Sequence, residues 1–404
     1  MHRSIRCLFG FISLLIIAVS ACGPLDRRSA VPQSEQKDVT VLGLSDARFW
    51  GDELTPQMVA SGLAAYRREQ AYAAEAGRAG PLPPAYYLAI SGGGENGAFG
   101  AGLLLGWTAT GTRPTFKVVT GVSTGALTAP FAFMGPAYDA QLRAIYTQIK
   151  PANVLEKRWI FAGIFGDAMA TNQPLFRTIQ RYVTPELLHA IAQQYEQGRL
   201  LLIGTTDLDA GRPVIWDIGR IATSGQPGAV ELVQKVLLAS AAIPVAFPPM
   251  MIDVQANGKQ YQEMNVDGGA TTQVFVYPPA LQLNKFGINR QRYLYVIRNA
   301  RLDPQWADVS RQTLSIAGRA TSSLIQTQGL GDLYRIYSVS QRDDVDFNLA
   351  YIPETFNVPL RYSFDPDYMN ALFDVGYNMG KAGYDWAKVP PGFGSINQHV
   401  TLSK

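Results

Sequence analysis

Short apolar runs alternate with segments of helical composition along most of the chain, and this alternation constrains the fold more than any other feature. The apolar runs cover residues 86–91, 116–121, 199–208, 213–218, 293–299 and 346–352. Several are apolar throughout, as expected for strands covered on both faces. Helical composition is found at 55–77, 136–149, 184–198, 229–242 and 366–388. The alternation predicts an α/β fold, with a largely parallel sheet and helices on both of its faces.

Composition narrows the class of protein further. The chain has 404 residues, of which 47% are hydrophobic and 17% charged, so it is long and apolar enough to bury a large core. The formal net charge is only +3 and the basic residues are scattered, which argues against a nucleic-acid partner. No Asp-rich calcium loop or His/Cys cluster stands out, so we expect a mechanism without a metal ion and without a cofactor.

The N-terminus has the pattern of an export signal. "MHRSIR" is basic, and the apolar segment after it is too short for a comfortable membrane span and leads through small residues to Cys22. The ending "VSAC" resembles the lipobox of bacterial lipoproteins, which implies a signal peptide over 1–21 and a lipid-modified Cys22. Gly23 after it is compatible with sorting to the outer membrane of the cell envelope. An ordinary signal peptide with an incidental cysteine is the alternative.

Two further segments precede the first predicted strand. Residues 22–40 are polar and contain proline without periodicity, so they are expected to form a flexible tether between the anchored Cys22 and the rest of the protein. Residues 41–84 are expected to form an N-terminal helical extension, because 55–77 begins with a Thr-Pro cap and is rich in alanine.

Glycines follow the first predicted strand in the pattern Gly92-x-Gly94-x-x-Gly97. This pattern matches the dinucleotide fingerprint, but no acidic residue follows about 20 positions later to hold a ribose. A phosphate-binding P-loop is also excluded, because Ala98 and Phe99 stand where that motif needs Lys and Ser or Thr. A tight strand-to-helix turn, or a site for a transient negative charge, remains.

The next predicted strand ends in Gly121-x-Ser123-x-Gly125, where a strand passes into a helix. This is the context of a nucleophile elbow, in which a sharp turn projects the serine hydroxyl from the end of the sheet. The preceding glycine loop then has a chemical use, because the N–H groups of Gly93 and Gly94 are suited to stabilise an oxyanion. The pair of motifs predicts nucleophilic catalysis by Ser123.

A serine needs a base to accept its proton. His189 lies at helical spacing and is expected to be a packed or surface histidine, while His399 lies in the C-terminal tail. Asp267 precedes Gly268 and Gly269 after an apolar approach, so its carboxylate is placed in a turn near the end of the sheet. Asp267 is the preferred candidate for the base, and a triad with His399 remains the alternative.

The glycine loop, the GxSxG motif and the Asp-Gly-Gly turn, in this order, resemble the patatin-like phospholipase family. The stretches "TTDLDAGRPVIWDI" and "LLASAAIPVAFPPM" are similar to segments of the same family. The resemblance implies a three-layer α/β/α catalytic domain over about 85–300, with the strand and helices of 301–404 packed on the same domain. It also implies a phospholipid or other acyl-ester substrate.

Carried over residue by residue, the resemblance implies that Ser123 is the nucleophile, Asp267 the base and Gly92 to Gly97 the oxyanion loop, without a histidine. Asn96 departs from the family, which commonly has a basic residue at this position. Aromatic and small apolar residues at 159–176 and 129–136 offer either an acyl-chain groove or ordinary core packing.

Three functions follow from these residues. The first is a lipid-anchored serine acyl-ester hydrolase that uses Ser123 and Asp267. The second is an α/β-hydrolase esterase with a Ser123–Asp–His399 triad. The third is a non-catalytic lipid-binding surface lipoprotein, which Asn96 supports and which a fold alone does not exclude.

Overall fold

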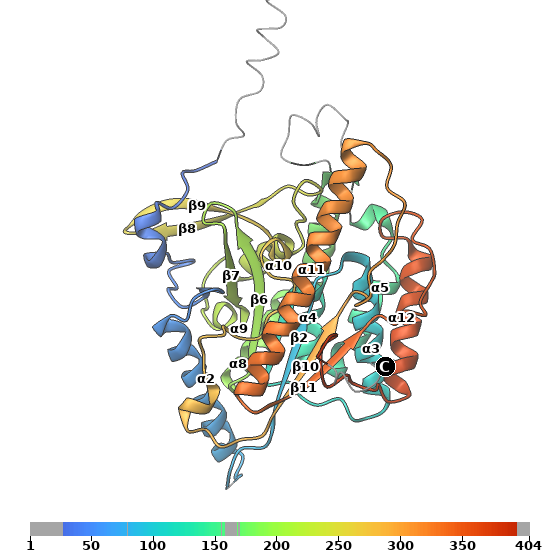
Figure 1. The fold of residues 1–404 in the computed structure, drawn as a ribbon. Helices are drawn as coiled ribbons and strands as arrows, with labels where there is room; N and C mark the ends of the chain where they lie inside the picture. The colour runs from blue at the N-terminus through green and yellow to red at the C-terminus, as the bar shows by residue number, and fades with distance from the viewer. Residues whose placement is uncertain (1–26, 79, 155, 158–167, 169, 394–404) are drawn as a thin grey trace, which may run out of the picture.

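One sheet organises the protein (Figure 1). The computed structural model describes residues 27–78, 80–154, 156–157, 168 and 170–393. Within these residues, nine strands form a sheet in the order β1-β7-β6-β3-β2-β10-β11, and the β8–β9 hairpin joins it through β6. Strands β6, β3, β2, β10 and β11 are parallel, while β1, β7, β8 and β9 make antiparallel pairs. The predicted largely parallel sheet is confirmed.

The strands are β1 Arg48–Trp50, β2 Ala85–Ile90, β3 Val118–Val122, β4 Glu156–Lys157, β5 Ala170–Thr171, β6 Leu200–Asp207, β7 Arg212–Asp217, β8 Met250–Ala256, β9 Lys259–Asp267, β10 Arg292–Arg298 and β11 Val345–Tyr351. The α-helices are α2 Pro56–Glu75, α3 Gly97–Ala109, α4 Thr124–Met134, α5 Asp139–Thr147, α7 Gln173–Tyr182, α8 Pro185–Glu196, α9 Ile218–Ala222, α10 Ala229–Ser240, α11 Thr313–Arg342 and α12 Pro366–Lys381. Strands β4 and β5 form a separate small ribbon. None of the described helices is long and apolar enough to cross a membrane.

Both faces of the parallel strands are covered, which explains their apolar sequences. Leu88 and Ile90 of β2 belong to the large core beneath α3, α4 and α12. Ala89 points to the opposite face, where Val296 of β10 packs with Leu333 of α11. Figure 1 shows α11 crossing in front of β10 and β11. This arrangement confirms the expected three layers, and β11 shows that the C-terminal part belongs to the same sheet.

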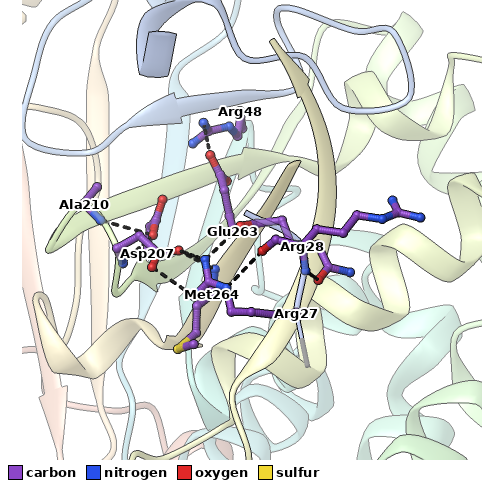
Figure 2. Close-up of polar contacts among 9 residues, drawn as sticks. Arg27, Arg28, Arg48, Asp207, Ala210, Glu263 and Met264 are labelled. Atoms are coloured by element: carbon purple, nitrogen blue, oxygen red, sulfur yellow. Dashed lines mark hydrogen bonds and ion pairs between the residues drawn. The ribbon is translucent and has the colours of Figure 1, made fainter. Parts of the chain in front are cut away.

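The predicted flexible tether over 22–40 is wrong for its described part, residues 27–40. The Arg27 guanidinium binds both Asp209 carboxylate oxygens, at 3.0 and 2.7 Å, and the Arg28 N–H donates to the Gln262 side chain at 2.9 Å (Figure 2). Side chains from the β6–β7 turn and from β9 therefore hold this polar segment, and its composition alone does not reveal these partners. Residues 1–26, which contain the predicted signal peptide, lie outside the described residues.

The predicted helical extension over 41–84 also contributes a strand. Strand β1 pairs with β7 at the edge of the sheet, and its Arg48 forms an ion pair of 2.6 Å with Glu263 of β9, shown in Figure 2. Both side chains are buried. Burial raises the pKa of Glu263 to about 7, against the opposing effect of Arg48. The N-terminal segment is therefore joined to the central sheet by backbone pairing and by a buried charge pair.

Helices α3 and α12 approach each other closely through glycines on both surfaces. A Cβ atom at Gly102 of α3 would collide with the carbonyl oxygen of Phe373, and a Cβ atom at Gly376 of α12 would collide with that of Phe99. Small residues permit such backbone contact between helices. Since α3 begins directly after the glycine loop, this contact fixes the helix that follows the candidate site.

We expect Gly376→Ala to lower the free energy of unfolding by about 1–3 kcal/mol, because the added methyl overlaps backbone atoms that do not move easily. Gly331→Ala on α11 is the matched control, since a Cβ atom there meets no neighbour, and it should be neutral or stabilising by up to about 1 kcal/mol. Chemical denaturation of the two variants measures the difference. Equal destabilisation of both would contradict the close contact.

Candidate active site

Ser123 occupies a strained turn between β3 and α4. Its φ is +56° and its ψ is −125°, which is uncommon for a residue other than glycine. A Cβ atom at Gly121 would collide with the backbone of Gly125, and one at Gly125 would collide with the backbone of Ile90. The two glycines therefore allow the sharp turn, as the GxSxG pattern predicts. The side chain of Ser123 lies directly beside the glycine loop, 3.2 Å from an ideal Cβ position on Gly92.

A second serine, Ser240 at the end of α10, binds the backbone of the turn that carries Ser123. The Ser123 N–H donates to the Ser240 hydroxyl at 2.9 Å, and that hydroxyl donates to the Gly204 carbonyl at 2.6 Å. Ser240 is fully buried, so its hydrogen bonds have no water to replace them. Ser240 lies within the "LLASAAIPVAFPPM" stretch, but no chemical pattern in the sequence identified its role.

Some backbone N–H groups of the glycine loop make hydrogen bonds within the described structure, and two do not. The Gly92 N–H donates to the Gln273 carbonyl at 3.0 Å, and the Gly97 N–H donates to the carbonyls of Gly94 and Glu95 in the turn that precedes it. No hydrogen bond joins the N–H groups of Gly93 or Gly94 to a described residue. Of the four glycines expected in the oxyanion loop, these two have donors available.

Asn299, just beyond β10, clamps the start of this loop. Its amide donates to the Ser91 carbonyl at 3.0 Å and its side-chain oxygen accepts the Gly100 N–H at 3.1 Å, so it bridges the two ends of the loop. Gly93, at a φ of +155°, lies so close to Asn299 that any side chain there would collide with it. Sequence reasoning assigned Asn299 only to a strand.

Asn96, the departure from the family pattern, also has a structural partner. Its side-chain oxygen accepts a hydrogen bond of 2.6 Å from the hydroxyl of Tyr368 on α12. This contact ties the glycine loop to α12 through a neutral pair in place of a charge. The hydrogen bond accounts for an asparagine at this position without assigning it a catalytic role.

Asp267 ends β9 next to the serine turn. Its carboxylate accepts the Gly269 N–H at 2.7 Å, and its own N–H donates to the Ala242 carbonyl at 2.9 Å. Gly268 packs tightly against the backbone of Gly204 on β6. Burial raises the pKa of Asp267 to about 6, while hydrogen bonds with the Ser123 side chain and the Gly269 N–H lower it. The carboxyl group is therefore near the serine and titrates closer to neutrality than an ordinary aspartate.

The turn after Asp267 is fixed by α11, a helix that the sequence did not predict. The buried Asp332 accepts the N–H groups of Gln273 and Val274, at 2.7 and 3.3 Å. Gln273 in turn donates from its side chain to the Gly269 carbonyl at 2.9 Å. A buried charge on α11 thus positions the loop that carries the candidate base and supports Gly92.

An almost entirely apolar pocket opens at Ser123. It is lined by Gly94, Ser123, Thr124, Leu127, Ile145, Tyr146, Ile149, Val154, Leu175, Ala241, Ile243, Phe247, Phe364 and Met369. Leu175 comes from the predicted groove segment 159–176, of which residues 159–167 and 169 lie outside the described part. In the other segment, 129–136, Phe131 and Phe133 are buried in the core. The core-packing alternative therefore applies to these two phenylalanines.

Of the remaining candidates, only His189 lies in the described residues, and it is away from this site. His189 lies on an exposed position of α8 and bonds to Gln193, while His399 and Cys22 lie outside the described residues. Among the residues that the structure describes, no three His, Cys, Asp or Glu side chains come together in a group able to hold a metal ion.

Residues 88–279 match the model of the patatin-like phospholipase family. This segment contains the glycine loop, Ser123 and Asp267, so the three motifs lie inside the part of the chain that matches the family. A comparison with curated proteins finds no match.

Three solved structures are similar in part. They are VipD from Legionella pneumophila (12% identity, 74% of this chain and 66% of that chain, TM-score 0.37), the type III effector protein ExoU (13%, 75% and 53%, TM-score 0.32) and the human GIVD cytosolic phospholipase A2 (10%, 69% and 51%, TM-score 0.29). The matches thus cover between half and two thirds of the length of these proteins.

We expect Ser240→Ala to slow the reaction of Ser123 with a fluorophosphonate about tenfold to a hundredfold, because a misplaced nucleophile loses much of its reactivity. The substitution removes the acceptor that holds the Ser123 N–H. Ser338→Ala is the control, since that hydroxyl bonds to its own helix on an exposed surface. An unchanged labelling rate in a folded Ser240→Ala protein would argue against this positioning role.

Proposed function

We propose that the protein is a lipid acyl hydrolase in which Ser123 is the nucleophile and Asp267 the base. The observation that carries the proposal is the strained serine turn placed between a buried carboxylate and a glycine loop with two available N–H groups. The family match over 88–279 supports a lipid ester as the substrate class. The apolar pocket at Ser123 supports the same class, because it offers an acyl chain a dry surface.

The reaction follows from these positions. Asp267 accepts the Ser123 proton as the serine oxygen attacks the ester carbonyl carbon. The oxyanion that forms is stabilised by the N–H groups of Gly93 and Gly94 and by the N-terminal end of α4. The alcohol leaves with the proton from Asp267, and an acyl-enzyme remains on Ser123. A water molecule then attacks the acyl-enzyme and gives a proton to Asp267. Asp267 passes this proton to the Ser123 oxygen as the acyl bond breaks, which releases the fatty acid and regenerates the serine.

We expect Ser123→Ala and Asp267→Asn to abolish hydrolysis of a long-chain ester, while His399→Ala keeps wild-type turnover. We also expect kcat/KM to rise with pH through a limb near pH 6, because Asp267 must be ionised to accept the proton and burial raises its pKa to about 6. Steady-state rates between roughly pH 4.5 and pH 9 measure both effects, because this interval lies on both sides of that pKa.

The contrary outcomes separate the alternatives. An active Asp267→Asn protein with an inactive His399→Ala protein would replace the proposed pair by a histidine triad. A folded wild-type protein that neither hydrolyses short or long acyl esters nor reacts with a fluorophosphonate would favour a lipid-binding lipoprotein.

We further propose that Cys22 carries a lipid and that the protein resides at the outer membrane of a bacterial envelope. The support is the "VSAC" sequence after a basic and apolar N-terminus. In a bacterial host, the wild-type protein should incorporate labelled palmitate and sediment with membranes, and Cys22→Ala should do neither. Labelling of the Cys22→Ala protein would place the modification elsewhere and overturn this assignment.

A further inference from the structure

A second apolar cavity lies far from Ser123, between α2 and the sheet face opposite to α3 and α4. Its volume is about 190 Å³. This exceeds the ~150 Å³ of an engineered apolar cavity that binds benzene, so it is large enough for a hydrocarbon segment. The described residues that line it are mainly apolar, and Ser123 and Asp267 are not among them.

Three parts of the chain enclose this cavity. Strand residues such as Leu202 and Ile215 form the floor, and the segment 276–290 forms one wall with Leu281 and Phe286. The floor extends from β7 to β10, which are four strand spacings apart in the sheet, or roughly 19 Å at about 4.8 Å per spacing. The cavity is therefore elongated across the strands, a shape that suits an extended chain.

The third side is α2, where Met58, Gly62 and Ala65 follow one another at helical spacing toward the cavity. Gly62 lies in the middle of this row, and a Cβ atom there would meet no other atom within 4 Å. Gly62 is exposed, so a larger side chain there would project beside the cavity lining without a collision.

One end of the cavity is basic. Lys117, Arg290 and Arg292 line it there, and Glu69 is the carboxylate that pairs with the first two, at 2.7 Å from each. Arg292 is buried and has no ion pair with any described residue, and its guanidinium donates to the Ile288 carbonyl at 2.8 Å. Three cations thus face one anion in a partly desolvated place, which favours a further negative charge.

The Lys117 ammonium, besides its pair with Glu69, donates to the carbonyl oxygens of Ala65 and Gly198. Burial and the neighbouring Arg290 lower its pKa to about 8, against the opposing effect of Glu69. A bound anion would stabilise the charged form of this lysine. Asp217, the acidic residue at the β7 end of the cavity, would disfavour an anionic head group there, so the charged head belongs at the basic end.

We propose that this cavity binds a long-chain fatty acid, with its carboxylate at Arg292 and a segment of its chain beneath α2. The elongated apolar floor and the unbalanced positive charge at one end together match a single-chain carboxylate. The choice of this ligand rests on the proposed function, because ester hydrolysis at Ser123 releases such an acid. The cavity would then hold the product of the reaction at a place separate from the catalytic serine.

Direct binding tests the proposal without any need for turnover. The full chain with Ser123→Ala is titrated with the fluorescent fatty acid cis-parinaric acid, and oleic acid and its methyl ester serve as competitors. Gly62→Leu, which places a bulky side chain at the cavity lining, should weaken binding at least tenfold, while Gly331→Leu on the exposed surface of α11 should leave it unchanged. Arg292→Gln should weaken competition by oleic acid and leave competition by the methyl ester unaltered.

Two results would overturn the proposal. One is undiminished binding to a folded Gly62→Leu protein, which would place the fatty acid elsewhere, for example in the pocket at Ser123. The other is equal competition by oleic acid and its methyl ester, which would show that no carboxylate is recognised. Failure of the proposed hydrolase function is a different result, because it would appear as a lack of turnover by the protein with Ser123 intact.

Discussion

The structure of the candidate site depends on a turn that most residues avoid. Ser123 adopts a positive φ, a conformation that costs of the order of 1–3 kcal/mol and persists only where the surroundings enforce it. Three contacts hold Ser123 in this conformation. Gly125 touches the end of β2, Ser240 binds the serine N–H, and the glycine loop packs against its side chain. The parallel strands β2 and β3 bring the glycine loop and the serine turn together, because their carboxyl ends lie side by side.

Burial of Asp267 imposes a second cost on the same site. The rise in its pKa from 3.8 to about 6 corresponds to roughly 3 kcal/mol that disfavours the ionised form. Because the folded-state pKa lies above the unfolded value, the folded protein binds more protons between these two pH values. This group therefore makes folding less favourable as pH rises through that window. The same environment makes the carboxylate a stronger base, so a stability cost accompanies a chemical gain.

The sequence was informative where local chemistry and periodicity agree. Apolar runs predicted the parallel strands, and the glycine and serine motifs predicted the turns after β2 and β3. It was less informative where a residue acts through a distant partner. Asn299 and Ser240 stabilise the site through contacts with residues distant in the sequence. No spacing of residues in the sequence indicates these contacts. Helix α11 was missed because apolar residues recur at helical spacing only in its second half, around Leu333. The β8–β9 hairpin did carry a local signal, since Asn257-Gly258 separates two alternating runs.

The ion pair between Arg27 and Asp209 bears on how an anchored form of this protein would meet a bilayer. Five peptide steps separate Cys22 from Arg27, which span at most about 18 Å. Asp209 follows β6, whose carboxyl end lies at the same sheet edge as Ser123 because β6 and β3 are parallel. With a lipid on Cys22, as proposed, this short segment would hold the end of the sheet that carries Ser123 close to the lipid surface. Orientation on the membrane would then be set by one arginine near the N-terminus as much as by the lipid itself.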